Sequence, residues 1–272
     1  MLVATAAGEA TAMDAHGYFV RTGEGRYTAT SHVGGAWFVD EQHIAPLLGL
    51  LTHLVEVDRD ARRTDGLVIT RLSFDILGRV GLDEVSTRVG TVRPGRSVEL
   101  IEAVASQYGR DVVILRAWLM KPAVTADIAG TALSSIARPE EAAPFDPTKV
   151  WPGKFIESIE VRRLQADPGR ALVWARTPLQ LIVEEPHSRF AATVGLLDIA
   201  NGMTVRADPA AVAFPNVDLT LHLFRQPEGE WVGFDTTVTF GAGGVGVTSS
   251  VIHDRAGPVA VMAQSLTIRP GV

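Results

Sequence analysis

From Arg71 the chain reads RLSFDILGRVGLDEVSTRVGTVRPGRSVELIEAVASQYGRDVVILRAWL, and from Asp218 it reads DLTLHLFRQPEGEWVGFDTTVTFGAGGVGVTSSVIHDRAGPVAVMAQSL. Each stretch holds four runs in which apolar and polar residues alternate, as they do in half-buried strands. The second stretch begins 147 residues after the first, and the turns between the runs recur at a similar offset. An internal repeat of this kind predicts one supersecondary unit that is built twice.

The strand signals of the two copies agree in detail. A short alternating run opens each copy and leads through polar residues to a second alternating strand. A hairpin signal that contains glycine separates the last two strands of each copy. The opening runs and hairpin signals are Leu72, Phe74, Ile76 and Gln107 to Arg110 in the first copy, and Leu219, Leu221, Leu223 and Asp254 to Gly257 in the second.

One helix is predicted upstream of each sheet. In the first copy, apolar residues from Ile44 to Val55 follow the i, i+3, i+4, i+7 spacing of an amphipathic helix, after the acids Asp40 and Glu41. In the second copy, the segment from Phe190 to Gly202 is apolar nearly all round, and its Asn-Gly ending predicts a C-cap. A helix that is apolar on every side must be buried.

A buried helix followed by antiparallel strands, written twice, predicts a helix wrapped by a curled sheet, which is the hot-dog arrangement. Two such sheets can pair edge to edge and so remove exposed edges that invite aggregation. We therefore expect an α+β double hot-dog with one continuous sheet. The predicted division is 1–121 for the first repeat, 122–150 for a connector with a short helix or wrapping coil, and 151–272 for the second repeat.

The composition excludes several classes of protein. The chain has no cysteine, which rules out disulfides, thiolate metal sites and a cysteine nucleophile. Its formal net charge of −6 argues against a nucleic-acid partner, because phosphate binding needs a basic face. The sequence has no apolar run of about 18 residues, and its first ten residues lack the basic region and the apolar run that are typical of a signal peptide, so we expect none. We expect a cytoplasmic protein without a membrane partner.

Two motif-like features have structural interpretations. The segment GAGGVG, from Gly241 to Gly246, matches the dinucleotide fingerprint, but a β-branched run continues as a strand from Val247, where the fingerprint must open a helix. We interpret these glycines as a turn or bulge. Seven histidines are scattered without a metal-binding pair, and no HExxH or GxSxG motif occurs. No metal and no cofactor are expected.

Asp198 stands out among the polar residues. It lies within LLDIA, inside the second predicted helix, which should be buried. An unpaired buried carboxylate costs several kcal/mol, so hydrogen-bond donors must match it. A structural carboxylate and a functional one are both consistent with this position.

The second copy resembles the C-terminal half of acyl-CoA thioesterase II enzymes. In that family a helix Asp, a strand Thr and a Gln on the last long strand hold the hydrolytic water. The matching positions are Asp198, Thr239 in the strand that begins at Trp231, and Gln264 in VAVMAQSLTIRP. Thr236 and Thr237 lie next to Thr239, and which threonine faces the water stays open.

The resemblance implies hydrolysis of an acyl-CoA to a free acid and CoA, with CoA present only as part of the substrate. A thioester carbonyl is already activated, so a water that Asp198 orients and partly deprotonates suffices. Thr239 and Gln264 can each donate and accept hydrogen bonds, and would fix that water. Backbone N–H groups near Gly34 and Gly35 are expected to stabilise the oxyanion. The acyl chain is expected in an apolar tunnel between the two helices.

The first copy does not repeat the predicted site. At an offset near 147, which varies by one residue between segments, it places Thr52, Thr91 or Val92, and Arg116 where the second copy has Asp198, Thr239 and Gln264. One active site per chain is therefore expected, with the first copy as its partner wall. Two alternatives remain: a non-catalytic acyl-thioester-binding or scaffold protein of the same fold, and an acyl-CoA hydratase, whose Asp/His motif is not visible. The resemblance also suggests a homodimer of such chains.

Overall fold

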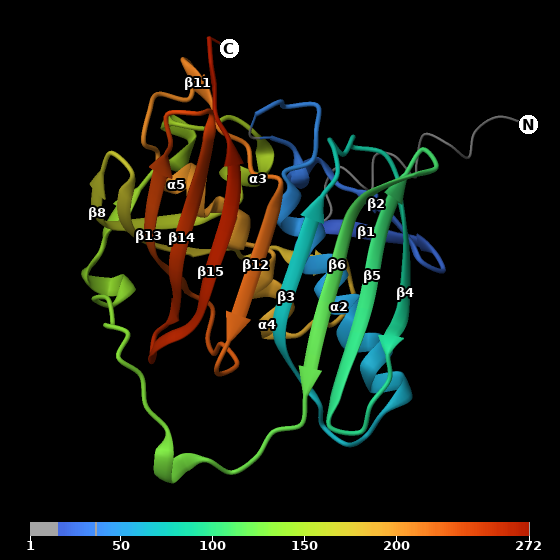
Figure 1. Ribbon diagram of the computed structural model, residues 1–272. Helices are drawn as coiled ribbons and strands as arrows, with labels where there is room; N and C mark the ends of the chain where they lie inside the picture. The colour runs from blue at the N-terminus through green and yellow to red at the C-terminus, as the bar shows by residue number, and fades with distance from the viewer. Residues whose placement is uncertain (1–15, 36, 272) are drawn as a thin grey trace, which may run out of the picture.

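The computed structural model describes residues 16–35 and 37–271. A large twisted sheet forms one layer, and the helices of both repeats cover one face of it (Figure 1). The first repeat consists of β1 (Gly17–Gly23), β2 (Arg26–Ala29), the 3-10 turn η1 (Ser31–Val33), α2 (Ile44–Arg62), β3 (Val68–Ile76), β4 (Val85–Arg93), β5 (Val98–Gln107) and β6 (Arg110–Met120).

The second repeat has the same order of long strands, with the added elements α3 (Lys154–Glu157) and β10 (Gln180–Ile182) and a helical layer that is broken into short pieces. It consists of α3, β8 (Glu160–Asp167), β9 (Arg170–Arg176), β10, α4 (Arg189–Val194), η5 (Leu197–Ile199), α5 (Ala200–Met203), β12 (Asp218–Leu223), β13 (Val232–Phe240), β14 (Val245–Asp254) and β15 (Gly257–Thr267). Two very short strands, β11 (Val212–Ala213) and β16 (Arg269–Pro270), pair with each other beside it.

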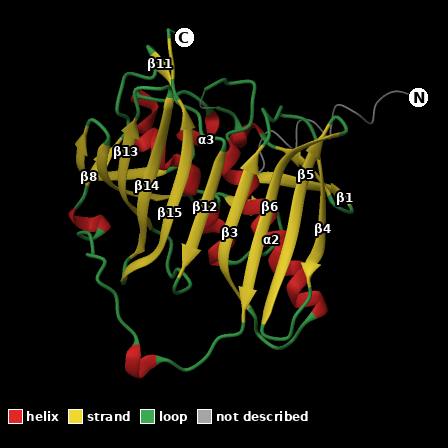
Figure 2. Ribbon diagram, viewed as in Figure 1, coloured by secondary structure: helices red, strands yellow, loops and turns green. Residues whose placement is uncertain are grey.

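The segment between the repeats passes along one end of the sheet as a long arc with short helical turns (Figure 2). Its last part adds a strand to the edge of the second repeat, because β7 pairs with β8. The elements of this segment are η2 (Ala126–Ile128), η3 (Pro139–Glu141), β7 (Ala143–Phe145) and η4 (Pro147–Lys149).

The two repeats join through β3 and β12 in the middle of the 14-stranded sheet, whose order is β10-β1-β2-β4-β5-β6-β3-β12-β15-β14-β13-β9-β8-β7. These strands are antiparallel, with Ser73 opposite Thr220, and the two hydroxyl oxygens lie 3.3 Å apart. The two residues are 147 positions apart, so they are equivalent in the two copies and a pseudo-two-fold axis passes between them. The predicted double hot-dog with one continuous sheet is confirmed.

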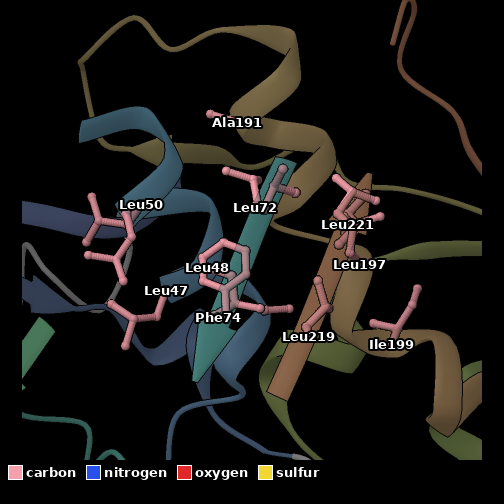
Figure 3. Close-up of a cluster of buried hydrophobic side chains, with 14 of the residues drawn as sticks. Leu47, Leu48, Leu50, Leu72, Phe74, Ala191, Leu197, Ile199, Leu219 and Leu221 are labelled. Carbon is pink, nitrogen blue, oxygen red and sulfur yellow. The ribbon is translucent and has the colours of Figure 1, made fainter. Parts of the chain in front are cut away.

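The helical segments cross on the same axis. A Cβ atom added to Gly49 of α2 would lie 2.9 Å from the Cα of Gly195, the residue that caps the end of α4. The two backbones therefore touch, and the tunnel that we predicted between the helices is closed at this crossing. Apolar side chains of α2, β3, β12 and the broken helix fill the space toward the sheet, and Figure 3 shows Leu47, Leu48, Leu50, Leu72, Phe74, Ala191, Leu197, Ile199, Leu219 and Leu221.

The prediction of one continuous helix from Phe190 to Gly202 is wrong, because the helix is broken in this segment. The helix begins after the N-cap Ser188, stops at Gly195, and resumes as η5 and α5. Gly195 allows the close approach to Gly49, but glycine also weakens a helix interior, which explains the break at this position. The predicted Asn-Gly C-cap lies inside α5, and Thr204 caps the end instead.

The turns follow the predicted chemistry. The glycine-rich segment forms the hairpin turn between β13 and β14, with Gly244 at a positive φ of 78°. The strand β14 begins directly at Val245, so the segment does not open a helix. The hairpin between β5 and β6 has Tyr108 and Gly109 at positive φ, as a two-residue hairpin turn requires.

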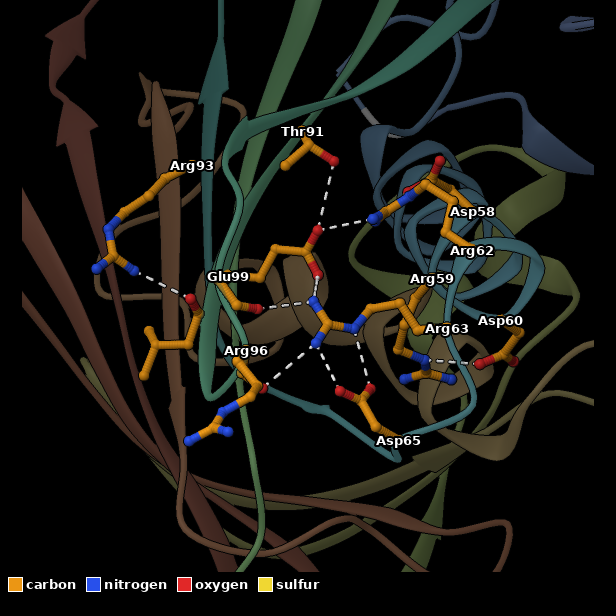
Figure 4. Close-up of polar contacts among 12 residues, drawn as sticks. Asp58, Arg59, Asp60, Arg62, Arg63, Asp65, Thr91, Arg93, Arg96 and Glu99 are labelled. Carbon is orange, nitrogen blue, oxygen red and sulfur yellow. Dashed lines mark hydrogen bonds and ion pairs between the residues drawn. The ribbon is translucent and has the colours of Figure 1, made fainter.

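A buried ion-pair network anchors the C-terminal end of α2. Glu99 on β5 is 1% exposed and accepts hydrogen bonds of 2.7 Å from both Arg62 and Arg63. Asp58 and Asp65 accept from other nitrogens of the same two guanidinium groups. Figure 4 shows this cluster between the helix end and the sheet, where it fixes the helix on its own repeat.

Candidate functional site

A cavity of about 770 Å³ lies where the two repeats meet. The first repeat contributes the residues around the start of α2, including Trp37, His43 and Ile44. The second repeat contributes Asp198 from η5 and Asn216 from the segment before β12. The site is thus built from both copies, and the first copy supplies a wall of it.

Asp198 is 6% exposed, and two side-chain amides hold one of its oxygens. The Nδ2 of Asn216 donates to Oδ1 at 2.7 Å, and the Nε2 of Gln264 donates to the same Oδ1 at 3.0 Å. No described residue donates a hydrogen bond to Oδ2. Because Asp198 lines the cavity, this second oxygen remains for a group that enters it.

Burial raises the pKa of Asp198 to about 7, although the hydrogen bonds from Asn216 and Gln264 lower it. An ordinary Asp titrates near pH 4, far below neutrality. A carboxyl that titrates close to neutral pH can both accept and return a proton, which is what general acid–base chemistry needs.

Gln264 lies behind Asp198 on β15 and is 1% exposed. Its register partner across the ladder is Thr248 on β14. The Oε1 of Gln264 and the Oγ1 of Thr248 are both buried without a hydrogen-bond partner in the described residues. A buried polar atom of this kind is commonly satisfied by a bound water.

The structure does not bring Thr239 to Asp198. The even spacing of eight residues places Thr239 on the same face of β13 as Trp231, and that is the outer face, where Thr239 is exposed. Thr237 is exposed on the same face, whereas Thr236 points into the core and its hydroxyl lies 2.8 Å from that of Ser250. The side chain that contacts the carboxylate together with Gln264 is that of Asn216.

Gly34 and Gly35 also differ from the prediction. The Gly34 N–H donates to the carbonyl of Ser31, and the Gly35 N–H donates to the carbonyl of Glu41, so neither faces an oxyanion. Gly35 has a φ of 104°, and a Cβ there would lie 2.7 Å from the Cα of Gly153. These glycines permit close contact between the repeats.

Asn216 was missed because its sequence context, PNVD ahead of a strand, is typical of a turn. Its amide is held by a second bond to the carbonyl of Asp218, at 3.1 Å. A useful signal was its place in the repeat: Asn216 lies just before the strand that begins the second repeated stretch.

None of the helices within residues 16–35 and 37–271 has the length and apolar character that crossing a membrane requires. Over the same residues, no three or more His, Asp or Glu side chains gather in a way that could hold a metal ion.

Two family models match the sequence. The model of the acyl-CoA thioesterase N-terminal domain matches residues 35–120, and that of the acyl-CoA thioesterase C-terminal domain matches residues 139–268. Together they cover far more than half of the chain. Among curated proteins, none is similar enough in sequence to count as a match.

Solved structures show the same fold at low identity. A hot-dog protein of unknown function from Alicyclobacillus acidocaldarius has a TM-score of 0.72 and 14% identity, covering 95% of this chain and 98% of its own. The acyl-CoA thioesterase II TesB2 of Mycobacterium marinum has a TM-score of 0.63 and 18% identity, with 93% and 96% coverage. The tesB protein of Mycobacterium avium subsp. paratuberculosis has a TM-score of 0.64 and 14% identity, covering 97% of this chain and 99% of its own. With both halves matched by the family's models and its fold present throughout, the chain belongs to the acyl-CoA thioesterase family.

Proposed function

We propose that this chain hydrolyses acyl-CoA thioesters at the cavity between its repeats, by means of a water that Asp198 orients and deprotonates. The observation that carries the proposal is the state of Asp198. It is a buried carboxyl with a pKa of about 7 that lines the cavity, and two amides hold it through one oxygen only. The family match supports an acyl-CoA as the substrate.

In the proposed reaction, the water gives one proton to Oδ2 of Asp198 while its oxygen attacks the thioester carbonyl carbon. The tetrahedral intermediate then collapses, and the carbon–sulfur bond breaks with its electron pair on sulfur. Asp198 returns the proton to that sulfur, so the products are the carboxylic acid and CoA as a thiol. No covalent enzyme intermediate is needed, because a thioester is activated enough for direct attack by water.

Asn216 and Gln264 act as positioning residues in this mechanism. Both donate to Oδ1, which leaves Oδ2 as the acceptor and fixes the plane of the carboxylate. Their donation also opposes the effect of burial on the pKa of Asp198, so that the anionic form remains accessible near neutral pH. Gln264 and Asn216 thus position the carboxylate, and Thr239 has no part in the proposed mechanism.

The test is thiol release from acetyl-, octanoyl- and palmitoyl-CoA by the wild-type protein and by Asp198→Asn. We expect hydrolysis of at least one substrate and a loss of at least about a hundredfold in kcat for the variant, the usual scale for a general base. Asp235→Asn is the matched control, because it makes the same chemical change on the outer face of β13, where Asp235 pairs with Arg170.

A wild-type protein that binds these acyl-CoAs without releasing thiol would be a non-catalytic acyl-thioester binder, and the hydrolase proposal would then be wrong. If the wild type and Asp198→Asn are equally active, the hydrolase function stands, but the role of Asp198 as the base is wrong.

A further inference from the structure

The start of α2 borders the cavity, and His43 is the N-cap residue of this helix. The Nδ1 of His43 accepts a hydrogen bond of 3.2 Å from the backbone N–H of Ala45. The next residue is Pro46, which has no N–H to offer. Histidine is not among the usual N-cap residues, which are Ser, Thr, Asp and Asn.

This cap fixes the tautomer of the imidazole. An Nδ1 that accepts a hydrogen bond carries no proton, so the neutral ring of His43 must carry its hydrogen on Nε2. Burial lowers the pKa of His43 to about 3, and the ring therefore stays neutral near pH 7. Its ring packs on that of Phe155, with the two centroids 4.2 Å apart.

The Nε2–H has no hydrogen-bond acceptor among the residues that the structure describes, although His43 lines the same cavity as Asp198. His43 is half-buried and lines the cavity, so its N–H is open to a hydrogen-bond acceptor that enters there. A neutral N–H donor can polarise a carbonyl without adding a proton of its own.

The pseudo-two-fold axis places His43 and Asp198 on the same side of the helix crossing. The two helices run in opposite directions through the contact of Gly49 with Gly195. His43 precedes Gly49 on the first helix, and Asp198 follows Gly195 on the second. Both residues thus lie at one end of the helix pair, and both line the cavity.

We propose that the Nε2–H of His43 donates to the carbonyl oxygen of the thioester and stabilises the oxyanion that forms there when water attacks. The proposal rests on the proposed hydrolase function. The proton stays on His43 throughout, and no charge is transferred to the ring. The start of the 19-residue helix α2 adds a positive potential that also favours an anion at this point.

His43→Ser tests the donor without removing the cap, because a serine hydroxyl can accept from the first turn of α2 as Nδ1 does. We expect kcat to fall by about 10²–10³-fold, the usual loss for one oxyanion donor, with little change in KM or in the melting temperature. Ser188→Ala is the control. It removes the N-cap of α4 at the other end of the helix pair, and should lower the melting temperature but leave kcat unchanged.

A second measurement is independent of turnover. Long-range proton–nitrogen NMR of the full chain should show His43 as the Nε2–H tautomer at neutral pH. Adding the S-(2-oxoalkyl)-CoA ketones that correspond to acetyl-, octanoyl- and palmitoyl-CoA, which cannot be hydrolysed, should shift the Nε2 and its proton for at least one of them.

The outcomes separate the two proposals. If the wild type hydrolyses a substrate and His43→Ser keeps its kcat, the role of His43 is wrong and the hydrolase function stands. If no substrate is hydrolysed but a ketone shifts the Nε2 signal, the hydrolase function is wrong and the contact of His43 with the carbonyl stands. If none of the ketones shifts the signal, the role of His43 is overturned in either case.

Discussion

At the scale of single residues, Asp198 determines how the protein responds to pH. Its carboxyl is more than nine-tenths buried, and its pKa of about 7 lies roughly three units above that of an Asp in an unfolded chain. The folded protein therefore binds a proton in a pH range where the unfolded chain has released it. Both activity and stability should show this difference.

The activity of the wild type should rise about tenfold per pH unit below an apparent pKa near 7 and level off above it, because the base must be ionised. The measurement is kcat/KM against pH with a substrate that is turned over, because kcat/KM reports the pKa of the free enzyme. A rising limb near pH 4, as for an ordinary carboxylate, would contradict this assignment.

The stability should change in the opposite direction. A carboxyl whose pKa is raised in the folded state contributes to the free energy of unfolding. This contribution is fully present below about pH 4 and is lost as the pH rises through about 7. Asp198→Asn removes this loss, so the variant should be more stable than the wild type at pH 8, by about 2–4 kcal/mol. Urea unfolding of both proteins at pH 8 and pH 4 measures this difference in the free energy of unfolding, which should be smaller at pH 4.

At the scale of elements, α2 is held differently at its two ends. The start borders the cavity through His43, whereas the end is fixed to β5 by Glu99 and two arginines. Burial alone would raise the pKa of Glu99, but the hydrogen bonds from Arg62 and Arg63 outweigh it and hold the pKa below its usual value. The helix end is therefore stabilised by the ionised form of Glu99.

Glu99→Gln should lower the free energy of unfolding by about 1–3 kcal/mol at neutral pH, because two charge-assisted hydrogen bonds lose their anion. Since the folded pKa of Glu99 is depressed, its contribution is present above about pH 4 and disappears as the pH falls through the folded value. Denaturant unfolding at neutral and acidic pH measures both. Glu102→Gln, at an exposed pair with Arg116, should cost much less.

The strands, the hairpin turns and the first helix could be predicted from the sequence because each depends on local periodicity or turn residues. The break in the second helix could not, since it depends on contact between Gly49 and Gly195 across the pseudo-axis. Asp198 could be singled out as a charge in an apolar segment. Thr239 was misplaced because a spacing of eight residues fixes a face but does not tell which face is inside.

At the scale of the whole molecule, two of the contacts between the repeats lie on one axis: Ser73 with Thr220 in the sheet, and Gly49 with Gly195 in the helical layer. The first is a hydrogen-bonded ladder and the second is a contact between backbones. The second leaves no space for a side chain.

Gly49→Ala should therefore destabilise the protein by about 1–3 kcal/mol, although alanine favours a helix more than glycine does. Its Cβ would lie 2.9 Å from Gly195 and 3.0 Å from the carbonyl of Ala191. Gly90→Ala, whose added methyl would meet nothing within 4 Å, is the control and should be close to neutral. Thermal unfolding of both variants would decide, and equal melting temperatures would refute the tight crossing.

The pseudo-axis also relates the two ends of the helix pair, and these ends carry different residues. Asp198 lies at one end, three residues after Gly195. The equivalent residue at the other end is Thr52, three residues after Gly49, which is buried and bonded to the carbonyl of Leu48. In an assembly of two identical chains, any substitution at one end would appear at both. Because one polypeptide carries both copies, natural selection can keep the carboxylate at one end and let the opposite end evolve independently toward stability or a new role.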